Sequence, residues 1–382
     1  MKEAEIKVTY EKLPENWFKS SFNSIEMIKR TITMLNEING FDLYDIEENL
    51  SEEKIVEKIG LKEHNIMLPL TYAMEEFLKS VVILYDVSSS NIRENKVKEA
   101  LLKVKNQSTI KGNLHNASIF IDYIKNNIDP NFLEILGLLY FSRRKGYDGG
   151  RERSNAYTYN IENKQERLKI ATEEFKNAFI DMRYLFEKTD EPRRMDLTKL
   201  MDYTESVRDA CLYLIMRKKY ISLLDSNDTF YNNNQFNEII SELNGLNNNS
   251  INRYEYIDVI DLLNNLSAGF NSYIDPLFKY CDEVANYISP LSGSVPLEQE
   301  VYVKEYLKNL FEVSNIEALR NLAIEERFKI SDKIEEKRDL LLDRLCEIED
   351  ECEHWISKMN EIYLPEYCKH DYKVEHTAHI TK

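Results

Sequence analysis

The chain has 382 residues, of which 43% are hydrophobic, so it is long enough to bury a sizeable core. Its 67 acidic and 50 basic side chains give a formal net charge of −17, so most of the surface repels nucleic acid and anionic lipid. Only 10 glycines and 8 prolines occur. This shortage of turn residues predicts an all-α multi-helix bundle and argues against a protein built on many short strands.

Targeting features are weak. The first 17 residues carry charges where a signal peptide would have an apolar stretch, and no run approaches the roughly 20 apolar residues of a membrane span. Five cysteines is an odd number, which does not fit a fully paired disulfide framework. We therefore expect a cytoplasmic protein with free thiols and no membrane partner.

In chain order, apolar spacing predicts helices over residues 17–39, 51–59, 69–85, 96–105 and 114–128. Residues 132–141 are apolar on nearly every side, which is typical of the central helix of a bundle. A further helix is expected over residues 163–187.

The helix at residues 69–85 is expected to be a core helix that begins with Pro69 in its first turn. Away from its apolar stripe it carries Glu75, Glu76 and Lys79. Glu75 and Lys79 are spaced as an i,i+4 ion pair, which on an exposed face would be a solvated pair. The alternative is that the carboxylates line a pocket or a dimer face.

His115 stands near the start of the predicted 114–128 helix. A histidine in this position can cap or pack against the helix. It can also serve as a general base or contact a phosphate, since histidine titrates near neutral pH.

Residues 142–160 are predicted to be a loop, and residues 140–159 hold five basic but only two acidic side chains. Tyrosines are interleaved with the basic residues, and this combination is typical of proteins that hold phosphates and stack unpaired bases. Another possibility is that the loop docks on an acidic neighbour within the same protein. The candidate RNA-binding residues are Lys145, Tyr147, Arg151, Arg153 and Tyr157.

In the second half, helices are predicted over residues 195–224, 235–244, 254–288, 298–312 and 315–330. Gly269 and Pro276 should break or kink the third of these. The acidic and proline-containing segment 190–192 is the predicted boundary between a domain of residues 1–190 and a domain of residues 191–382.

A long helix is predicted over residues 332–365, followed by a short polar tail. Its apolar positions alternate by three and four, as in a coiled coil, with Arg338 as the polar intruder. This seam requires a partner helix. The partner can come from the same chain, or residues 334–362 can bind a second copy of the chain or another protein. The seam consists of Ile334, Leu341, Leu345, Ile348, Cys352, Trp355, Met359 and Ile362.

Three of the five cysteines and four of the six histidines lie near the C-terminus. Cys368, His370, His376 and His379 could form a zinc site, but a loose tail is the simpler interpretation. We predict no metal and no cofactor. Phosphate-binding, dinucleotide-binding, esterase and zinc-protease motifs do not occur in the sequence.

Residues 73–79 have the form A-x-E-E-x-x-K, and a histidine, His115, stands near the start of the next predicted apolar helix. With the short segment containing Arg143, Arg144, Tyr147 and Asp148, residues 60–190 resemble HEPN-type helical domains, and among these the AbiV abortive-infection branch. This resemblance implies a phage-defence protein. Active members of the wider group are metal-independent ribonucleases with an R-x4–6-H motif, two copies of which meet across a dimer.

This chain departs from that motif, because no arginine lies four to six residues before a histidine in its first half. The nearest arrangement is Lys111 before His115. Whether the protein is an enzyme therefore stays open. One hypothesis is a defence effector that binds or cleaves RNA, with His115 as general acid and base and Arg143 or Arg144 stabilising the transition-state charge. The other is a non-enzymatic helical protein that binds a partner through its C-terminal coiled coil.

Overall fold

The computed structural model describes residues 13–39, 63–87, 92–109, 114–147, 197–224, 258–288 and 322–363. Within these ranges all regular secondary structure is α-helical, in eight helices with no strand, which confirms the predicted all-α class. The chain divides into two compact units, and the division falls between Ile215 and Met216. The boundary predicted at 190–192 lies outside the described residues, as do the helices predicted at 51–59, 163–187, 235–244 and 298–312.

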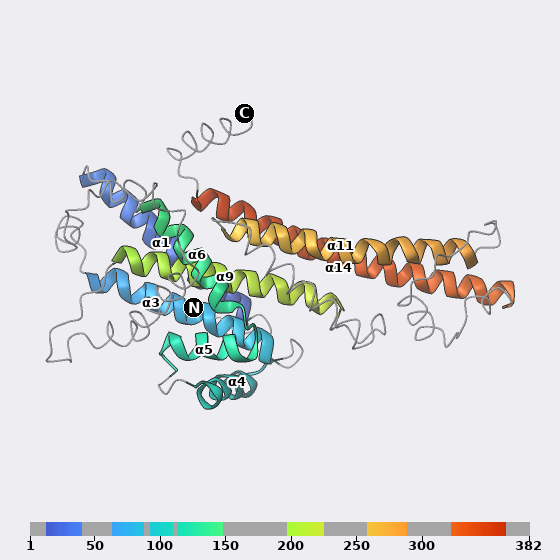
Figure 1. Cartoon of the computed structure of the whole chain (residues 1–382), viewed down its shortest axis with the longest axis horizontal. Helices are drawn as coiled ribbons and strands as arrows, with labels where there is room; N and C mark the ends of the chain where they lie inside the picture. Colours follow the sequence, from blue (N-terminus) through green and yellow to red (C-terminus); the bar gives the residue numbers. More distant parts are fainter. Residues whose placement is uncertain are drawn as a thin grey trace, which may run out of the picture. The chain divides into compact units, whose positions relative to one another are not determined.

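The described residues of unit 1 form six helical segments, which Figure 1 shows gathered around α3 and the first part of α9. α1 packs along α3, and α5 packs against α3, α4 and α6. The segments are α1 (Leu13–Asn39), α3 (Glu63–Asp86), α4 (Glu94–Gln107), α5 (Ala117–Asn127), α6 (Phe132–Tyr147) and α9 (Leu197–Leu224) as far as Ile215.

α3 is a core helix, as its apolar stripe predicts. Phe77 is fully buried and its ring lies 5.0 Å from that of Phe18 on α1, measured between centroids. Complete burial of one such side chain stabilises the fold by roughly 1.5–3 kcal/mol. The buried members of the stripe are Leu70, Ala73, Met74, Phe77 and Val81.

The prediction that Pro69 occupies the first turn of this helix is wrong, because α3 begins at Glu63 and Pro69 lies inside it. A proline in a helix interior removes one backbone hydrogen bond, here to the carbonyl of Asn65. The helix nevertheless extends upstream of it. Preference for proline at a helix start is therefore a poor guide here.

Among the described helices of unit 1, α9 is the most enclosed, since residues 202–215 are all buried. It contacts α1, α3 and α6: Lys29 of α1 pairs with Glu205, the Tyr85 hydroxyl of α3 donates to the Leu214 carbonyl at 3.0 Å, and Tyr140 of α6 lies against Tyr203. We expected residues 132–141 to be the central helix. Over residues 132–140 of α6 only Glu134 is exposed, but α9 is buried over a longer uninterrupted stretch.

α6 continues through Tyr147, so the prediction of a loop from residue 142 is wrong for residues 142–147. Arginine and lysine favour helices, and Arg143, Arg144 and Lys145 extend the apolar helix that precedes them. Their side chains, like residues 148–160, lie outside the part that the structure describes.

Unit 2 contains the end of α9, α11 (Val259–Ile288) and α14 (Ile324–Tyr363). The sequence predicts a break or kink of α11 at Gly269 and Pro276, and the break does not occur, because α11 is a continuous helix of 30 residues. α14 is a continuous helix of 40 residues, which joins the end of the predicted 315–330 helix to the predicted 332–365 helix. None of the described helices combines the length and apolar character that crossing a membrane requires.

The heptad seam of α14 lies on its buried face, and α11 is the helix that packs against it (Figure 1). The seam thus has a partner within the chain. Asn271 of α11 donates to Glu349 at 2.7 Å, and Lys219 at the end of α9 pairs with Glu351. The seam positions that are buried are Ile334, Leu341, Leu345, Cys352, Trp355 and Met359, with Ile348 half-buried.

Candidate active site

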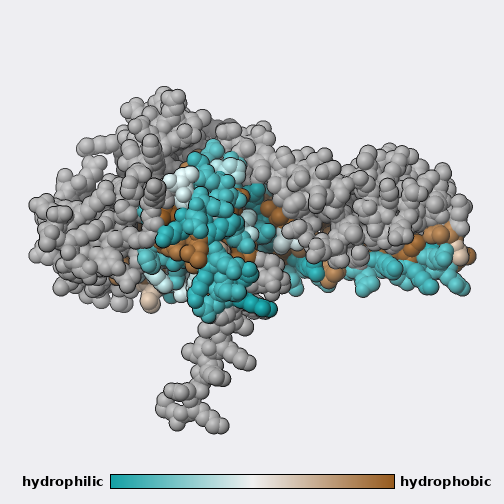
Figure 2. Space-filling view, turned by 90° about the horizontal axis from the view of Figure 1, so that it is seen from below, coloured by the Kyte–Doolittle hydropathy of each residue, from teal (hydrophilic) through white to brown (hydrophobic). Residues whose placement is uncertain are grey.

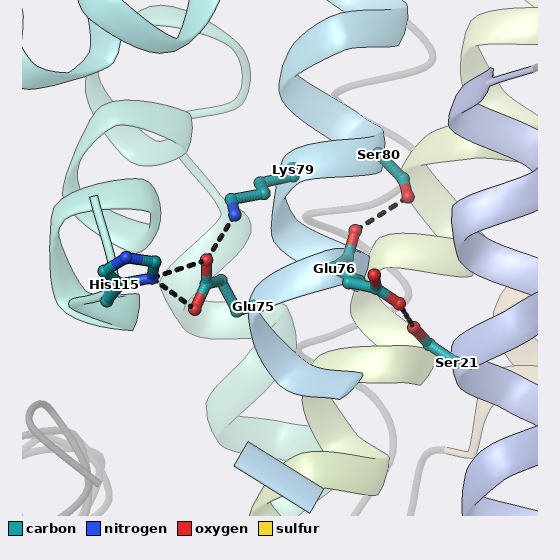
Figure 3. A network of polar contacts seen from close by, with 6 residues as sticks. All are labelled: Ser21, Glu75, Glu76, Lys79, Ser80 and His115. Atoms are coloured by element: carbon teal, nitrogen blue, oxygen red, sulfur yellow. Dashed lines mark hydrogen bonds and ion pairs between the residues drawn. The ribbon is translucent and has the colours of Figure 1, made fainter. Parts of the chain in front are cut away.

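The carboxylate of Glu75 lies in the middle of α3 and is almost completely buried, with 1% of the residue exposed. It forms an ion pair with Lys79, one turn further along the helix. His115 reaches the same carboxylate from the segment before α5, with Nδ1 3.2 Å from Oε1 and 3.4 Å from Oε2 (Figure 3). A buried carboxylate is stable only when it is paired, and these two side chains supply the pairing.

The position of His115 is set by the start of α5. The side chain of Asn116 caps this helix by accepting a hydrogen bond from the Ser118 backbone N–H at 2.9 Å. α5 therefore begins at Ala117, three residues later than predicted, and His115 lies just outside it. Its side chain is 48% exposed, so an external molecule can reach the ring although Glu75 beneath it is buried.

A second set of contacts fixes α5 against α3 and α4. At the far end of α5, the Tyr123 hydroxyl donates to Asp86 of α3 at 2.5 Å, and Lys103 of α4 donates to the same carboxylate at 2.9 Å. Asp122 accepts from the backbone and the hydroxyl of Thr109 at the end of α4. Burial opposes the charge of Asp122, but these hydrogen bonds lower its pKa.

α4 covers the end of α5 that contains Asp122 and Tyr123. The outer face of α4 is hydrophilic, as the middle of Figure 2 shows.

The contact with Glu75 determines which tautomer a neutral His115 adopts. An ionised carboxylate only accepts hydrogen bonds, so Nδ1 must carry the proton and Nε2 is then the basic nitrogen. When Nε2 gains a proton, the nearby carboxylate stabilises the imidazolium. This arrangement is suited to general acid–base chemistry at Nε2.

The neighbouring Glu76 points to the opposite side of α3 (Figure 3). Its Oε2 accepts from the Ser21 hydroxyl of α1 at 2.5 Å, and its carboxylate also holds the hydroxyl of Tyr72. Burial and the contact with Glu76 raise the pKa of Tyr72 to about 12, so this hydroxyl remains a donor at neutral pH. Of the two adjacent carboxylates, Glu76 thus joins α3 to α1, and Glu75 contacts His115.

The sequence-predicted site residues therefore separate into two groups. The solvated-pair interpretation of Glu75 and Lys79 is wrong, because Glu75 is buried, and tertiary contacts add His115 to this pair. The structure gives Arg143, Arg144, Lys145 and Tyr147 a helical backbone only, and Arg151, Arg153 and Tyr157 lie outside the described residues. Whether these basic residues approach His115 remains a prediction.

The sequence did not reveal a buried ionic cluster between α1 and α9. Arg208 is fully buried, its Nε lies 2.9 Å from Oδ1 of Asp209, and its guanidinium lies over the ring of Phe22 at 5.3 Å. Glu205 and Glu26 approach Nη1 at 4.0 and 3.9 Å. Burial opposes the charge of Arg208, but Asp209 and Glu205 outweigh it and raise its pKa. For Glu26, a carboxylic acid, burial disfavours the charged form and therefore raises the pKa.

A signal for this cluster exists in the sequence. Residues 210–216 are apolar around the whole circumference of a helix, which predicts a helix enclosed on all sides. Charged residues one or two turns earlier on such a helix, here Glu205, Arg208 and Asp209, have no solvated face available. We place this cluster in the structural core of unit 1, since it joins α1 to α9.

Among the described residues, no group of three or more His, Cys, Asp or Glu side chains could hold a metal ion. Cys352 is buried in the seam of α14, whereas His354 is exposed beside Trp355, so the two side chains point to different sides. Cys368, His370, His376 and His379 lie outside the described residues. The described cysteines Cys211, Cys346 and Cys352 are free thiols.

Comparisons of the chain with protein-family models, with curated proteins and with solved structures find no match.

Proposed function

We propose that this protein acts on RNA in bacterial defence against phage, through metal-independent cleavage at His115. The observation that carries the proposal is the contact between the buried Glu75 carboxylate and Nδ1 of a half-exposed histidine. The role in defence rests on the resemblance of residues 60–190 to the AbiV branch of HEPN-type domains. Recognition of RNA rests on the basic and tyrosine-rich composition of residues 140–159.

In the proposed reaction, Nε2 of His115 accepts the proton of a ribose 2′-hydroxyl. The 2′-oxygen then forms a bond to the adjacent phosphorus, and the bond from phosphorus to the 5′-oxygen breaks. The imidazolium returns the proton to the departing 5′-oxygen, which leaves a 2′,3′-cyclic phosphate and a 5′-hydroxyl. Glu75 stabilises the imidazolium between these two steps, and Lys79 pairs with the Glu75 carboxylate.

Charge on the phosphorane must also be stabilised, and Arg143 and Arg144 are the proposed donors. Guanidinium groups match the geometry of phosphate oxygens and are always charged. Lys145, Tyr147, Arg151, Arg153 and Tyr157 are the proposed contacts to the phosphate backbone and the unpaired bases. Because these contacts replace counterions, binding should weaken steeply as salt is raised.

The test is incubation of the purified full-length chain with single-stranded RNA in the presence of EDTA. We expect cleavage that leaves 2′,3′-cyclic phosphate ends, and we expect His115→Ala to abolish it. His354→Ala is the matched control, because His354 is an exposed histidine on α14 in unit 2. RNA with a 2′-deoxy nucleotide at the cleaved position should resist. Equal cleavage by the His115→Ala variant would remove the proposed role of this residue.

A second candidate function is non-enzymatic binding of a protein partner through α14. The favouring observation is that large apolar side chains remain exposed on this helix although its seam is covered by α11 (Figure 2). A homo-oligomer through residues 334–362 is one form of this hypothesis. Light scattering of the wild type and of a Leu340→Asp/Leu342→Asp variant tests it, since loss of assembly in the variant would support self-pairing. The exposed residues are Ile324, Phe328, Leu340 and Leu342.

A further inference from the structure

Tyr72 is unusual among the residues of α3. Over residues 68–86, where the structure describes burial along this helix, only Pro69 and Tyr72 are exposed. Tyr72 is 48% exposed, while the positions that follow it bury the core of unit 1. An aromatic ring exposed on an otherwise enclosed helix invites a functional explanation, since its exposed face buries no core surface.

The ring of Tyr72 is also held in place. Its hydroxyl hydrogen-bonds to the carboxylate of Glu76, which in turn accepts from Ser21 on α1 at 2.5 Å. A side chain fixed at its tip loses little conformational freedom when a ligand packs on its face. Tyr72 therefore presents a ring that is oriented before anything binds.

The position of Tyr72 relative to the His115 contact follows from helix geometry. Tyr72 precedes Glu75 by three residues, which is a rise of about 4.5 Å and a rotation of about 60° from Glu75. Lys79 follows Glu75 by four residues, which is a rise of about 6 Å along the helix axis. Around the axis it is rotated by about 40° from Glu75, toward the same side as Tyr72. Tyr72 and Lys79 thus occupy helix positions one turn before and one turn after Glu75 on one stripe of α3, and the hydroxyl of Tyr72 turns toward Glu76.

We propose that Tyr72 is the platform on which an unpaired nucleobase of the bound RNA stacks, beside the phosphodiester whose cleavage His115 promotes. The inference rests on the proposed function and adds the element that selects single-stranded substrate. Tyrosine suits this role because every base has a flat π-face, so stacking tolerates any sequence but requires the base to be unpaired. Lys79 and His115 supply charge on the other side of Glu75, where a phosphate would lie.

The experiment uses the full-length chain and a fluorescent single-stranded oligonucleotide, either intact or with abasic sites. Removing the bases should weaken binding to the wild type by about ten-fold or more. Tyr72→Leu should weaken binding of the intact oligonucleotide by a similar factor and leave binding of the abasic one unchanged. Tyr72→Phe should retain most of the affinity, because it keeps the ring. Leu102→Ala, on an exposed leucine of α4, is the matched control and should bind normally.

The kinetic consequences separate this inference from the proposed function. Tyr72→Leu should raise KM about ten-fold with little change in kcat, whereas His115→Ala should lower kcat. If cleavage depends on His115 but Tyr72→Leu has a normal KM and a normal response to abasic sites, the stacking role is wrong and the proposed function stands. If binding depends on Tyr72 and His115→Ala still cleaves, the proposed chemistry is wrong and the stacking role stands. If the wild type neither binds nor cleaves RNA, both are wrong.

Discussion

Nδ1 of His115 lies 3.2 Å from Oε1 of Glu75, although 40 residues separate them in the chain. The contact joins the segment before α5 to the middle of α3, and it places an imidazole that solvent can reach on a carboxylate that solvent cannot. This combination of one buried and one exposed partner distinguishes the pair from the ion pairs on the surface of α4, whose partners are all exposed.

Glu75 and Glu76 are adjacent carboxylates with different partners, which makes them a natural matched pair. We expect Glu75→Gln to reduce RNA cleavage by about 100-fold or more, because the neutral amide no longer stabilises the imidazolium or fixes the tautomer of His115. At saturating RNA, Glu76→Gln should leave the cleavage rate close to that of the wild type, since Glu76 faces Ser21 and does not contact the imidazolium. Single-turnover cleavage measured on both variants checks this, and equal losses would contradict the assignment of Glu75.

Arg208 is fully buried against Asp209, so its removal should destabilise unit 1 strongly. We expect Arg208→Met to lower the free energy of unfolding by about 3–5 kcal/mol, because it leaves buried carboxylates without their cation. Arg93→Met, on an exposed arginine before α4, should change it by no more than about 0.5 kcal/mol.

The two tryptophans of the chain allow this measurement to be made on each unit. Trp17 lies on α1 in unit 1 and Trp355 on α14 in unit 2. In a Trp355→Phe background, urea unfolding followed by fluorescence reports on Trp17 and therefore on unit 1. A midpoint for Arg208→Met equal to that of the background would show that the buried cluster does not stabilise this unit.

The packing of α14 on α11 should depend on its buried seam and not on its outer face. Met359 is completely buried, so Met359→Ala should destabilise unit 2 by about 2–5 kcal/mol. Leu342→Ala, on a side chain that is 40% exposed, should have a much smaller effect. Unfolding followed through Trp355 in a Trp17→Phe background distinguishes the two. Similar losses for both variants would mean that the outer face of α14 is also covered.

The thiols should differ in reactivity and in their contribution to stability at high pH. Cys346 is exposed and should react rapidly with a thiol reagent, whereas Cys352 is buried and should react only on unfolding. The rapid reaction that disappears in the Cys346→Ser variant is then assigned to Cys346. Burial raises the pKa of Cys352 from 9.0 to about 11.

Because the folded protein disfavours the thiolate of Cys352, this residue contributes its full stability below pH 9. That contribution should be lost as the pH rises from about 9 to about 11. Urea unfolding across this range should show a steeper decline for the wild type than for Cys352→Ser. Parallel declines would contradict the raised pKa.

The class of fold could be predicted from the sequence because it depends on local properties. Apolar residues repeated with the period of a helix, and few glycines or prolines interrupted them. The same periodicity identified the α14 seam, since a heptad pattern lies entirely within one helix. Helix limits were predicted less well: Pro69 and Pro276 lie inside helices, because packing of a whole apolar face outweighs the loss of one backbone hydrogen bond.

The chain by itself determined that Glu75 and Lys79 would meet, because four residues on a helix bring side chains together. Only the tertiary structure decided that Glu75 would be buried and that His115 would reach it, since both depend on how α5 and α1 pack on α3. The burial of Arg208 on α9 likewise depends on tertiary packing, because α1 supplies Phe22 and Glu26 beside its guanidinium. Burial is a property of neighbours that are distant in sequence, and it changes a surface ion pair into a candidate active site.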